Sequence, residues 1–198
     1  MWISNLNAPD ETVVAGLHDD IVRFDERCRA AGLATSPLNA VHAFHTPLMT
    51  PMVDQLRPTA DAMTPRPPSI PLISTLTGHA LPAGALMDTD YWYRQMLSPV
   101  AFSGAIQELA SAGYDTFIEI GPQPLLTLLG RRSVASKACV WLGSLRRGRS
   151  DWLQMQGTLA ALFARGVEFD ARALAAPDRP RPVALPGYPL ERRRWRID

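Results

Sequence analysis

The sequence has few of the features that mark secreted, membrane-spanning or metal-dependent proteins. Its 198 residues include two cysteines, Cys28 and Cys139, too few and too far apart for a disulfide framework or a cysteine metal site. No apolar run approaches the ~20 residues of a membrane-spanning helix, and the N-terminus lacks the basic start and apolar core of a signal peptide. A reducing, cytoplasmic setting with no membrane partner is therefore expected.

The sequence also lacks an excess of charge of either sign. The formal net charge is +1, with 20% charged and 46% hydrophobic residues, as in an ordinary globular protein. Of the 20 basic residues only Lys137 is a lysine and the rest are arginines, a bias that we attribute to the genome. The short basic stretch at residues 191–196 is a weak nucleic-acid signal, so no nucleic-acid partner is expected.

The first 39 residues read as strand, turn, strand, helix and strand. Strands are predicted at residues 2–6 and 12–16, with turn residues between them. A helix over residues 17–31 ends at Gly32, and a short strand is predicted at residues 34–39.

Residues 64–142 alternate between strands and helices. Three strands are predicted, at residues 70–75, 116–120 and 139–142. The helices are expected to begin near Asp88, at the Ser98–Pro99 pair, and after Gly121-Pro122. This alternation predicts an α/β fold with a parallel sheet.

The chain is organised around residues 40–52, where two histidines precede a helix. Thr46-Pro47 and Thr50-Pro51 are both suited to a cap and first turn. The second pair is the better start, because a helix begun at the first would leave the carbonyl of Pro47 facing Pro51, which has no amide hydrogen. Pro58 is expected to kink or shorten this helix.

His45 therefore lies on irregular backbone directly ahead of a helix. A neutral imidazole held at one nitrogen can accept a proton at the other, which suits a general base. The alternative is a loop histidine that caps a helix or fills a gap, and spacing alone favours it. No metal site is predicted, because His42 and His45 have no further ligands at usable spacing.

Four separated motifs stand out along the chain. The first is His-Ala-Phe-His-Thr-Pro-Leu-Met at residues 42–49, and the second is Ile-Pro-Leu-Ile-Ser-Thr-Leu-Thr-Gly at residues 70–78. The third begins with Tyr-Trp and ends with Ser-Pro-Val-Ala-Phe within residues 91–102, and the fourth is Phe-Ile-Glu-Ile-Gly-Pro at residues 117–122. In this order the four motifs resemble the malonyl-type acyltransferase domains of modular polyketide synthases, and the resemblance covers roughly the first 140 residues.

The resemblance implies the C-terminal half of an acyltransferase fold, a parallel-sheet, hydrolase-like core with part of a small ferredoxin-like subdomain. The implied divisions are residues 1–39 for the partial subdomain and residues 40–142 for the core. Residues 143–198 would form the linker that follows such domains. In that linker Leu190 and Arg196 depart from the family, which puts the strength of docking in question. A helix capped by Ser150 and ending at Gly166 is predicted to start it.

The resemblance also assigns roles to residues. His45 would be the general base, and the main-chain carbonyl of Gln95 would hold its imidazole, leaving the Gln95 side chain with little importance. Away from the motif, Gln95 reads as an exposed helix residue. His42 and Phe44 would set substrate choice, because a phenylalanine beside the acyl pocket leaves little room for an α-methyl branch. Without a pocket there, Phe44 reads equally well as core packing and His42 as a structural residue.

The implied reaction transfers malonyl from coenzyme A to the phosphopantetheine thiol of an acyl carrier protein, with no cofactor bound. No serine lies in the Gly-His-Ser-x-Gly setting of the family's nucleophile, and the arginine that binds the malonyl carboxylate would also lie upstream. We therefore expect the isolated chain to be inactive and to need an upstream half, with neighbouring synthase domains such as the ketosynthase as further partners. The alternative is a non-catalytic remnant or a domain-docking module.

Overall fold

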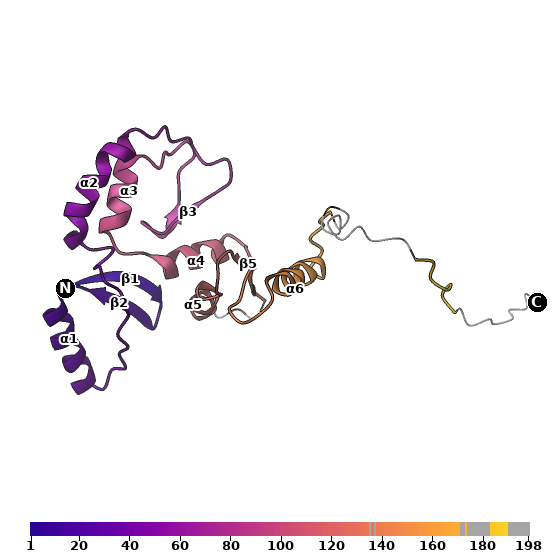
Figure 1. Cartoon of the computed structure of the whole chain (residues 1–198), viewed down its shortest axis with the longest axis horizontal. Helices are drawn as coiled ribbons and strands as arrows, with labels where there is room; N and C mark the ends of the chain where they lie inside the picture. Colours follow the sequence, from indigo (N-terminus) through magenta and orange to yellow (C-terminus); the bar gives the residue numbers. More distant parts are fainter. Residues whose placement is uncertain (135, 137, 171–172, 174–182, 190–198) are drawn as a thin grey trace, which may run out of the picture. The chain divides into compact units, whose positions relative to one another are not determined.

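The computed structural model of the chain describes residues 1–134, 136, 138–170, 173 and 183–189. The chain divides into two compact units, Met1–Thr158 and Leu159–Asp198. Within the described residues, the strands form three two-stranded sheets, all in the first unit (Figure 1). None of the described helices is both long and apolar enough to cross a bilayer.

The first sheet is the predicted N-terminal hairpin. Strands β1 (Trp2–Ala8) and β2 (Glu11–Ala15) pair antiparallel around a tight turn. A short connection leads from β2 to helix α1 (His18–Ala30). Cys28, on the predicted apolar face of this helix, is buried. Gly32 follows at φ +74°, which confirms the predicted end of this helix. The pairing of β1 with β2 confirms the predicted hairpin.

The strand predicted at residues 34–39 is wrong. This segment is exposed throughout and adopts no regular structure. The amide of Ala40 bonds locally to the carbonyl of Leu38, and Pro37 has no amide hydrogen to offer a neighbouring strand. The segment is therefore a surface connection between α1 and the histidine loop.

The helix after the histidine loop begins where predicted. A short 3₁₀ turn η1 (Pro47–Met49) precedes helix α2 (Thr50–Asp61), so each of the two Thr-Pro pairs starts a turn and only the second starts an α-helix. Pro58 falls within the last turn of α2 and does not end it earlier. Helix α3 (Thr89–Leu97) begins directly after Asp88, as predicted. Helix α2 packs beside it (Figure 1).

The strand predicted at residues 70–75 is shorter than expected. Strand β3 is Ile73–Ser74, and it pairs antiparallel with β4 (His79–Ala80) as a small hairpin. Ile70 is 76% exposed, and Pro71 cannot donate a ladder hydrogen bond. This hairpin therefore adds nothing to a parallel sheet.

The helix start predicted at Ser98 and Pro99 is also wrong. Ser98 ends α3, and helix α4 (Phe102–Ser111) begins after Ala101. Between the two helices Val100 is bound to β1: its amide donates to the Ser4 carbonyl at 2.8 Å, and its carbonyl accepts from the Leu6 amide at 2.9 Å. This long-range pairing holds the backbone extended where a local cap had been expected.

The predicted parallel pair is present. Strands β5 (Thr116–Glu119) and β6 (Val140–Gly143) pair in register, and helix α5 (Leu126–Ser133) connects them. The Glu119 carboxylate accepts from the amides of Leu125 and Thr127 at 3.0 and 2.8 Å, which satisfies donors at the start of α5. The mixed α/β architecture agrees with the fold class expected from the sequence.

Further contacts tie the hairpin to the rest of the first unit. Helices α4 and α5 both pack on β1. At the hairpin turn, Arg132 of α5 bonds to Asp10 at 2.8 Å and to Glu11 at 2.5 Å. These carboxylates raise the pKa of the Arg132 guanidinium above its ordinary value. The boundary at residue 39 stays a prediction, since residues on both sides of it belong to one compact unit.

The helix predicted after Ser150 is α6 (Asp151–Phe163), and Gly166 follows it at φ +84°. Its first half is anchored to the end of β6, because the side chains of Gln154 and Thr158 both donate to the Gly143 carbonyl, at 3.0 and 2.8 Å. Tyr188 is exposed. The departures noted at Leu190 and Arg196 lie outside the described residues.

Candidate functional site

His45 occupies an unusual backbone conformation. Its φ is +62°, and it is the one non-glycine residue with positive φ among those the structure describes. This left-handed region is uncommon for residues with a side chain and costs of the order of 1–3 kcal/mol unless the surroundings hold it. Here the His45 amide donates to the Met96 carbonyl at 3.1 Å, which fixes the loop against the end of α3.

Thr46 secures the other side of this conformation. Its side chain is fully buried, and its hydroxyl donates to the Ala43 carbonyl at 2.7 Å and accepts from the Leu48 amide at 3.3 Å. The same residue thus closes the loop before His45 and caps the 3₁₀ turn after it. A strained backbone that is bonded on both sides gives the imidazole a defined direction.

The imidazole is held by one nitrogen. Nδ1 of His45 lies 3.0 Å from the main-chain carbonyl of Gln95 in α3. Because a carbonyl oxygen only accepts, the neutral ring carries its hydrogen on Nδ1. The lone pair is then on Nε2, and the ring is half-buried. The structure therefore brings together the two groups that the sequence paired, in the tautomer that a general base requires.

Helix α3 is fastened to α2 by a polar cluster. Arg57 bonds to Asp90 at 2.9 Å, and its guanidinium lies 5.6 Å from the ring centre of Tyr93. The Tyr93 hydroxyl donates to Asp54 at 3.2 Å. Desolvation, followed by this hydrogen bond, raises the pKa of Tyr93. Since η1 and α2 follow His45 directly and α3 carries Gln95, this cluster joins the two elements that carry the site residues.

Phe44 and His42 lie beside each other on the loop before His45. Their rings meet edge to face, with centroids 5.7 Å apart and planes at 85°. Phe44 is 48% exposed and His42 is exposed. Phe44 is therefore not a core residue of the chain as described, and one of its faces is open to contact by another molecule or segment.

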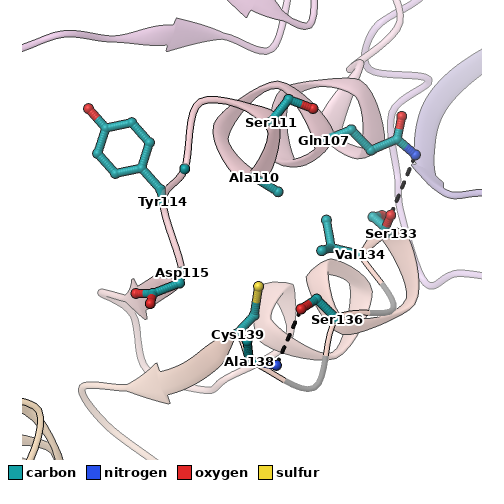
Figure 2. A pocket seen from close by; sticks show the side chains of 11 residues that line it. Gln107, Ala110, Ser111, Tyr114, Asp115, Ser133, Val134, Ser136, Ala138 and Cys139 are labelled. Atoms are coloured by element: carbon teal, nitrogen blue, oxygen red, sulfur yellow. Dashed lines mark hydrogen bonds between the residues drawn. The ribbon is translucent and has the colours of Figure 1, made fainter.

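A cavity of about 410 Å³ lies elsewhere in the first unit (Figure 2). Its walls come from the end of α4, the turn before β5, the end of α5 and the approach to β6. Figure 2 shows Tyr114, Asp115 and Cys139 around it, with the Gln107 amide bonded to the Ser133 carbonyl on one side. None of His42, Phe44, His45 and Gln95 lines this cavity, and it contains no histidine.

No group of three or more metal-ligating side chains is found in the part of the chain that the structure describes. That His42 and His45 form no metal site stays a prediction.

Sequence reasoning missed two side-chain contacts behind His45. The Gln95 amide nitrogen donates to the Thr75 hydroxyl at 3.2 Å, and the Ser74 and Tyr91 hydroxyls lie 2.8 Å apart. The one available signal was the four-residue spacing of Tyr91 and Gln95, which places both on one face of a helix.

The chain is similar to known proteins over most of its length. A family model described as acyl transferase domain matches residues 2–168. Polyketide synthase GfsA of Streptomyces halstedii is 34% identical over 200 residues, which cover 99% of this chain and 3% of that protein. The acyltransferase domain from the second module of the salinomycin polyketide synthase is 33% identical, with a TM-score of 0.85, over 93% of this chain and 43% of that structure.

A more distant structure shares the fold alone. The malonyl CoA-acyl carrier protein transacylase from Clostridium perfringens is 21% identical, with a TM-score of 0.74, over 83% of this chain and 50% of that structure. The chain thus spans half or less of the solved structures named here and a small part of the curated synthases. With the family model matched over most of its length and the fold reproduced, the chain belongs to the acyltransferase domains of polyketide synthases.

Proposed function

We propose that this chain is the base-bearing part of an acyltransferase that moves malonyl from coenzyme A to the phosphopantetheine thiol of an acyl carrier protein. The observation that supports this most is the 3.0 Å contact between Nδ1 of His45 and the Gln95 carbonyl. It orients the ring and leaves Nε2 as the proton acceptor, the arrangement that an acidic residue provides in other acyl-transfer sites.

In the proposed first half-reaction, Nε2 of His45 takes the proton of a serine hydroxyl as that oxygen attacks the thioester carbonyl of malonyl-CoA. The tetrahedral intermediate collapses, the C–S bond breaks, and the imidazolium returns its proton to the departing coenzyme A thiolate. In the second half-reaction, His45 takes the proton of the carrier's phosphopantetheine thiol. The thiolate displaces the serine, which recovers the proton, and malonyl is carried away as a new thioester.

The serine is proposed to come from another segment of polypeptide. None of the serines in the 198 residues has glycine two positions before and two positions after it, as the family's nucleophile does. By resemblance, the arginine that binds the malonyl carboxylate belongs to the same upstream half. That half, the carrier protein and adjoining synthase domains such as the ketosynthase are the proposed partners. The proposed setting is the cytoplasm, with residues 143–198 as a linker.

Placing the base and the serine on separate segments predicts the outcome of a labelling experiment. The chain alone, incubated with radiolabelled malonyl-CoA, should not form a malonyl-enzyme, because it supplies a base and no activated nucleophile. Mixed with an upstream half that bears the Gly-His-Ser-x-Gly serine, it should restore labelling of that serine. We call this mixture the reassembled domain. Labelling of the chain by itself would refute the assignment.

A non-catalytic docking module is the competing function. The exposed Tyr188 and the proline-rich segment around it are the features that favour it. A docking module would bind neighbouring synthase domains equally well whether or not His45 is intact, and it would not restore labelling. The reassembly experiment therefore separates the two functions.

Phe44 is proposed to favour malonyl over methylmalonyl. Its exposed ring stands one residue before His45, so its volume would border the acyl group if the base acts there. Replacing Phe44 with serine in the reassembled domain should raise the kcat/KM for methylmalonyl-CoA relative to malonyl-CoA by about tenfold, the discrimination that one methyl group provides. Competition between the two labelled thioesters measures this ratio.

The matched control for this prediction is Phe44→Tyr, which keeps the ring volume and should keep the preference. An unchanged ratio in Phe44→Ser would show that the ring does not border the acyl group.

A further inference from the structure

Two side chains of α3 reach the same turn behind His45. Tyr91 and Gln95 are one helical turn apart, and their polar ends contact Ser74 and Thr75 at 2.8 and 3.2 Å. Ser74 is 1% exposed. Helix α3 is therefore bound to the β3–β4 hairpin by two hydrogen bonds on one face, on top of its packing against α2.

The turn that receives these bonds is itself held by backbone hydrogen bonds. The Ser74 carbonyl accepts from the amide of Gly78 at 2.8 Å, and the Thr75 carbonyl accepts from the amide of Ala101 at 2.7 Å. Gly78 has φ +77°, and the Cβ of any other residue would contact Ala101 at 3.5 Å. The Thr75 hydroxyl is thus attached to backbone that is bonded on both sides, which makes it a fixed anchor.

Gln95 joins this anchor to the imidazole. Its main-chain carbonyl accepts from Nδ1 of His45, and its side-chain amide donates to Thr75. The remaining amide atom, Oε1, is enclosed and has no hydrogen-bond partner among the described residues. The bond to Thr75 is therefore the amide's polar attachment in the described part of the chain, and losing it would leave the amide nitrogen without this partner as well.

We propose that the Gln95 amide and the Thr75 hydroxyl are positioning groups, which hold the Gln95 carbonyl in line with Nδ1 of His45. This revises the expectation that the Gln95 side chain has little importance. The rate effect rests on the function proposed above, whereas the effect on the ring tautomer does not. A one-ångström shift of the carbonyl would allow the hydrogen to move to Nε2, which would remove the proton acceptor.

The test measures the ring directly. In the full chain with ¹⁵N-labelled histidine, NMR should show neutral His45 mainly as the Nδ1–H tautomer. Thr75→Val, which keeps the shape and removes the hydroxyl, should lower the ratio of Nδ1–H to Nε2–H by about fivefold, the worth of one neutral hydrogen bond. Thr75→Ser should restore it. Gln95→Met, which keeps the main-chain carbonyl, should repeat the loss and gives a second reading if Thr75→Val folds poorly.

The matched control is Thr77→Val, which makes the same chemical change on the same hairpin, where the hydroxyl accepts from the His79 amide at 3.2 Å. It should leave the tautomer ratio unchanged. In the reassembled domain, Thr75→Val should lower kcat in proportion to the fraction of His45 that leaves the Nδ1–H tautomer, with KM unaltered, because the hydroxyl is proposed to act through the ring.

The two readings separate two kinds of failure. A tautomer ratio that is unchanged in both Thr75→Val and Gln95→Met would overturn the positioning proposal, whatever His45 does. A changed ratio with a kcat that does not follow the measured Nδ1–H fraction would support the positioning and instead count against His45 as the base.

Discussion

Replacing His45 with asparagine is expected to lower the rate of malonyl transfer in the reassembled domain by roughly 10²–10⁴-fold, the usual contribution of a positioned general base. Asparagine is the informative substitution because His45 lies at φ +62°, a conformation that asparagine tolerates and that alanine adopts with strain. The variant removes the proton acceptor with the loop retained. Single-turnover labelling with malonyl-CoA measures the rate of the step concerned.

His42→Asn is the control for this prediction. His42 belongs to the same loop and meets Phe44 edge to face, but it is Nδ1 of His45 that bonds to Gln95. His42→Asn should therefore retain most of the transfer rate, even if it alters substrate preference. Equal losses in the two variants would show that the loop as a whole matters and that His45 has no distinct chemical role.

Replacing Gly130 with alanine is expected to destabilise the first unit by about 3 kcal/mol, near the upper end of the usual cost of overpacking a core. Gly130 lies in α5 against β6, and an added Cβ would overlap the Trp141 ring, coming 2.5 Å from its Cη2. The ring cannot easily move away, because it is stacked on Phe117 with centroids 4.2 Å apart. Urea unfolding should show a lower midpoint with an unchanged slope.

Gly157→Ala provides the matched control. Gly157 is in α6, where an added Cβ meets nothing within 4 Å. Alanine there should raise stability by about 0.5–1 kcal/mol, because it lowers the backbone entropy lost on helix formation. A neutral Gly130→Ala variant would mean that Trp141 repacks freely, contrary to the stacked arrangement.

Local signals predicted the elements that depend on local chemistry. The start of α2 at Thr50 follows from the missing amide hydrogen of Pro51, and the end of α1 follows from Gly32 at positive φ. The parallel β5–β6 pair follows from strands separated by a helix. At the two helix ends a few neighbouring residues determine the backbone, and for the parallel pair the order strand, helix, strand is itself the signal.

The failures occurred where distant segments determine the structure. Ser98 and Pro99 satisfy every local rule for a helix start, yet Val100 is held extended by two backbone hydrogen bonds to β1, nearly a hundred residues earlier. A short strand at residues 34–39 was equally plausible by composition, but no strand of the described residues pairs with it. Residue patterns do not report whether a given segment finds a distant partner, as Val100 does in β1 and residues 34–39 do not among the described strands.

In the candidate site, too, some contacts were predicted and others were not. Resemblance paired His45 with the Gln95 carbonyl, and the structure places the two atoms at hydrogen-bond distance. Nothing in the sequence indicated that His45 would adopt a left-handed backbone or that the Gln95 side chain would reach Thr75. The first depends on the bond from the His45 amide to the Met96 carbonyl, and the second on the bonds between α3 and the β3–β4 hairpin. The catalytic roles given to these residues stay predictions.

The most direct test of His45 as the base is chemical rescue of His45→Gly in the reassembled domain. Glycine accepts the φ of +62° without strain and leaves the space of the ring empty. Malonyl labelling of the serine should be slow in this variant and should rise in proportion to added neutral imidazole, which supplies the missing proton acceptor. Labelling at the wild-type rate with no imidazole present would contradict the account.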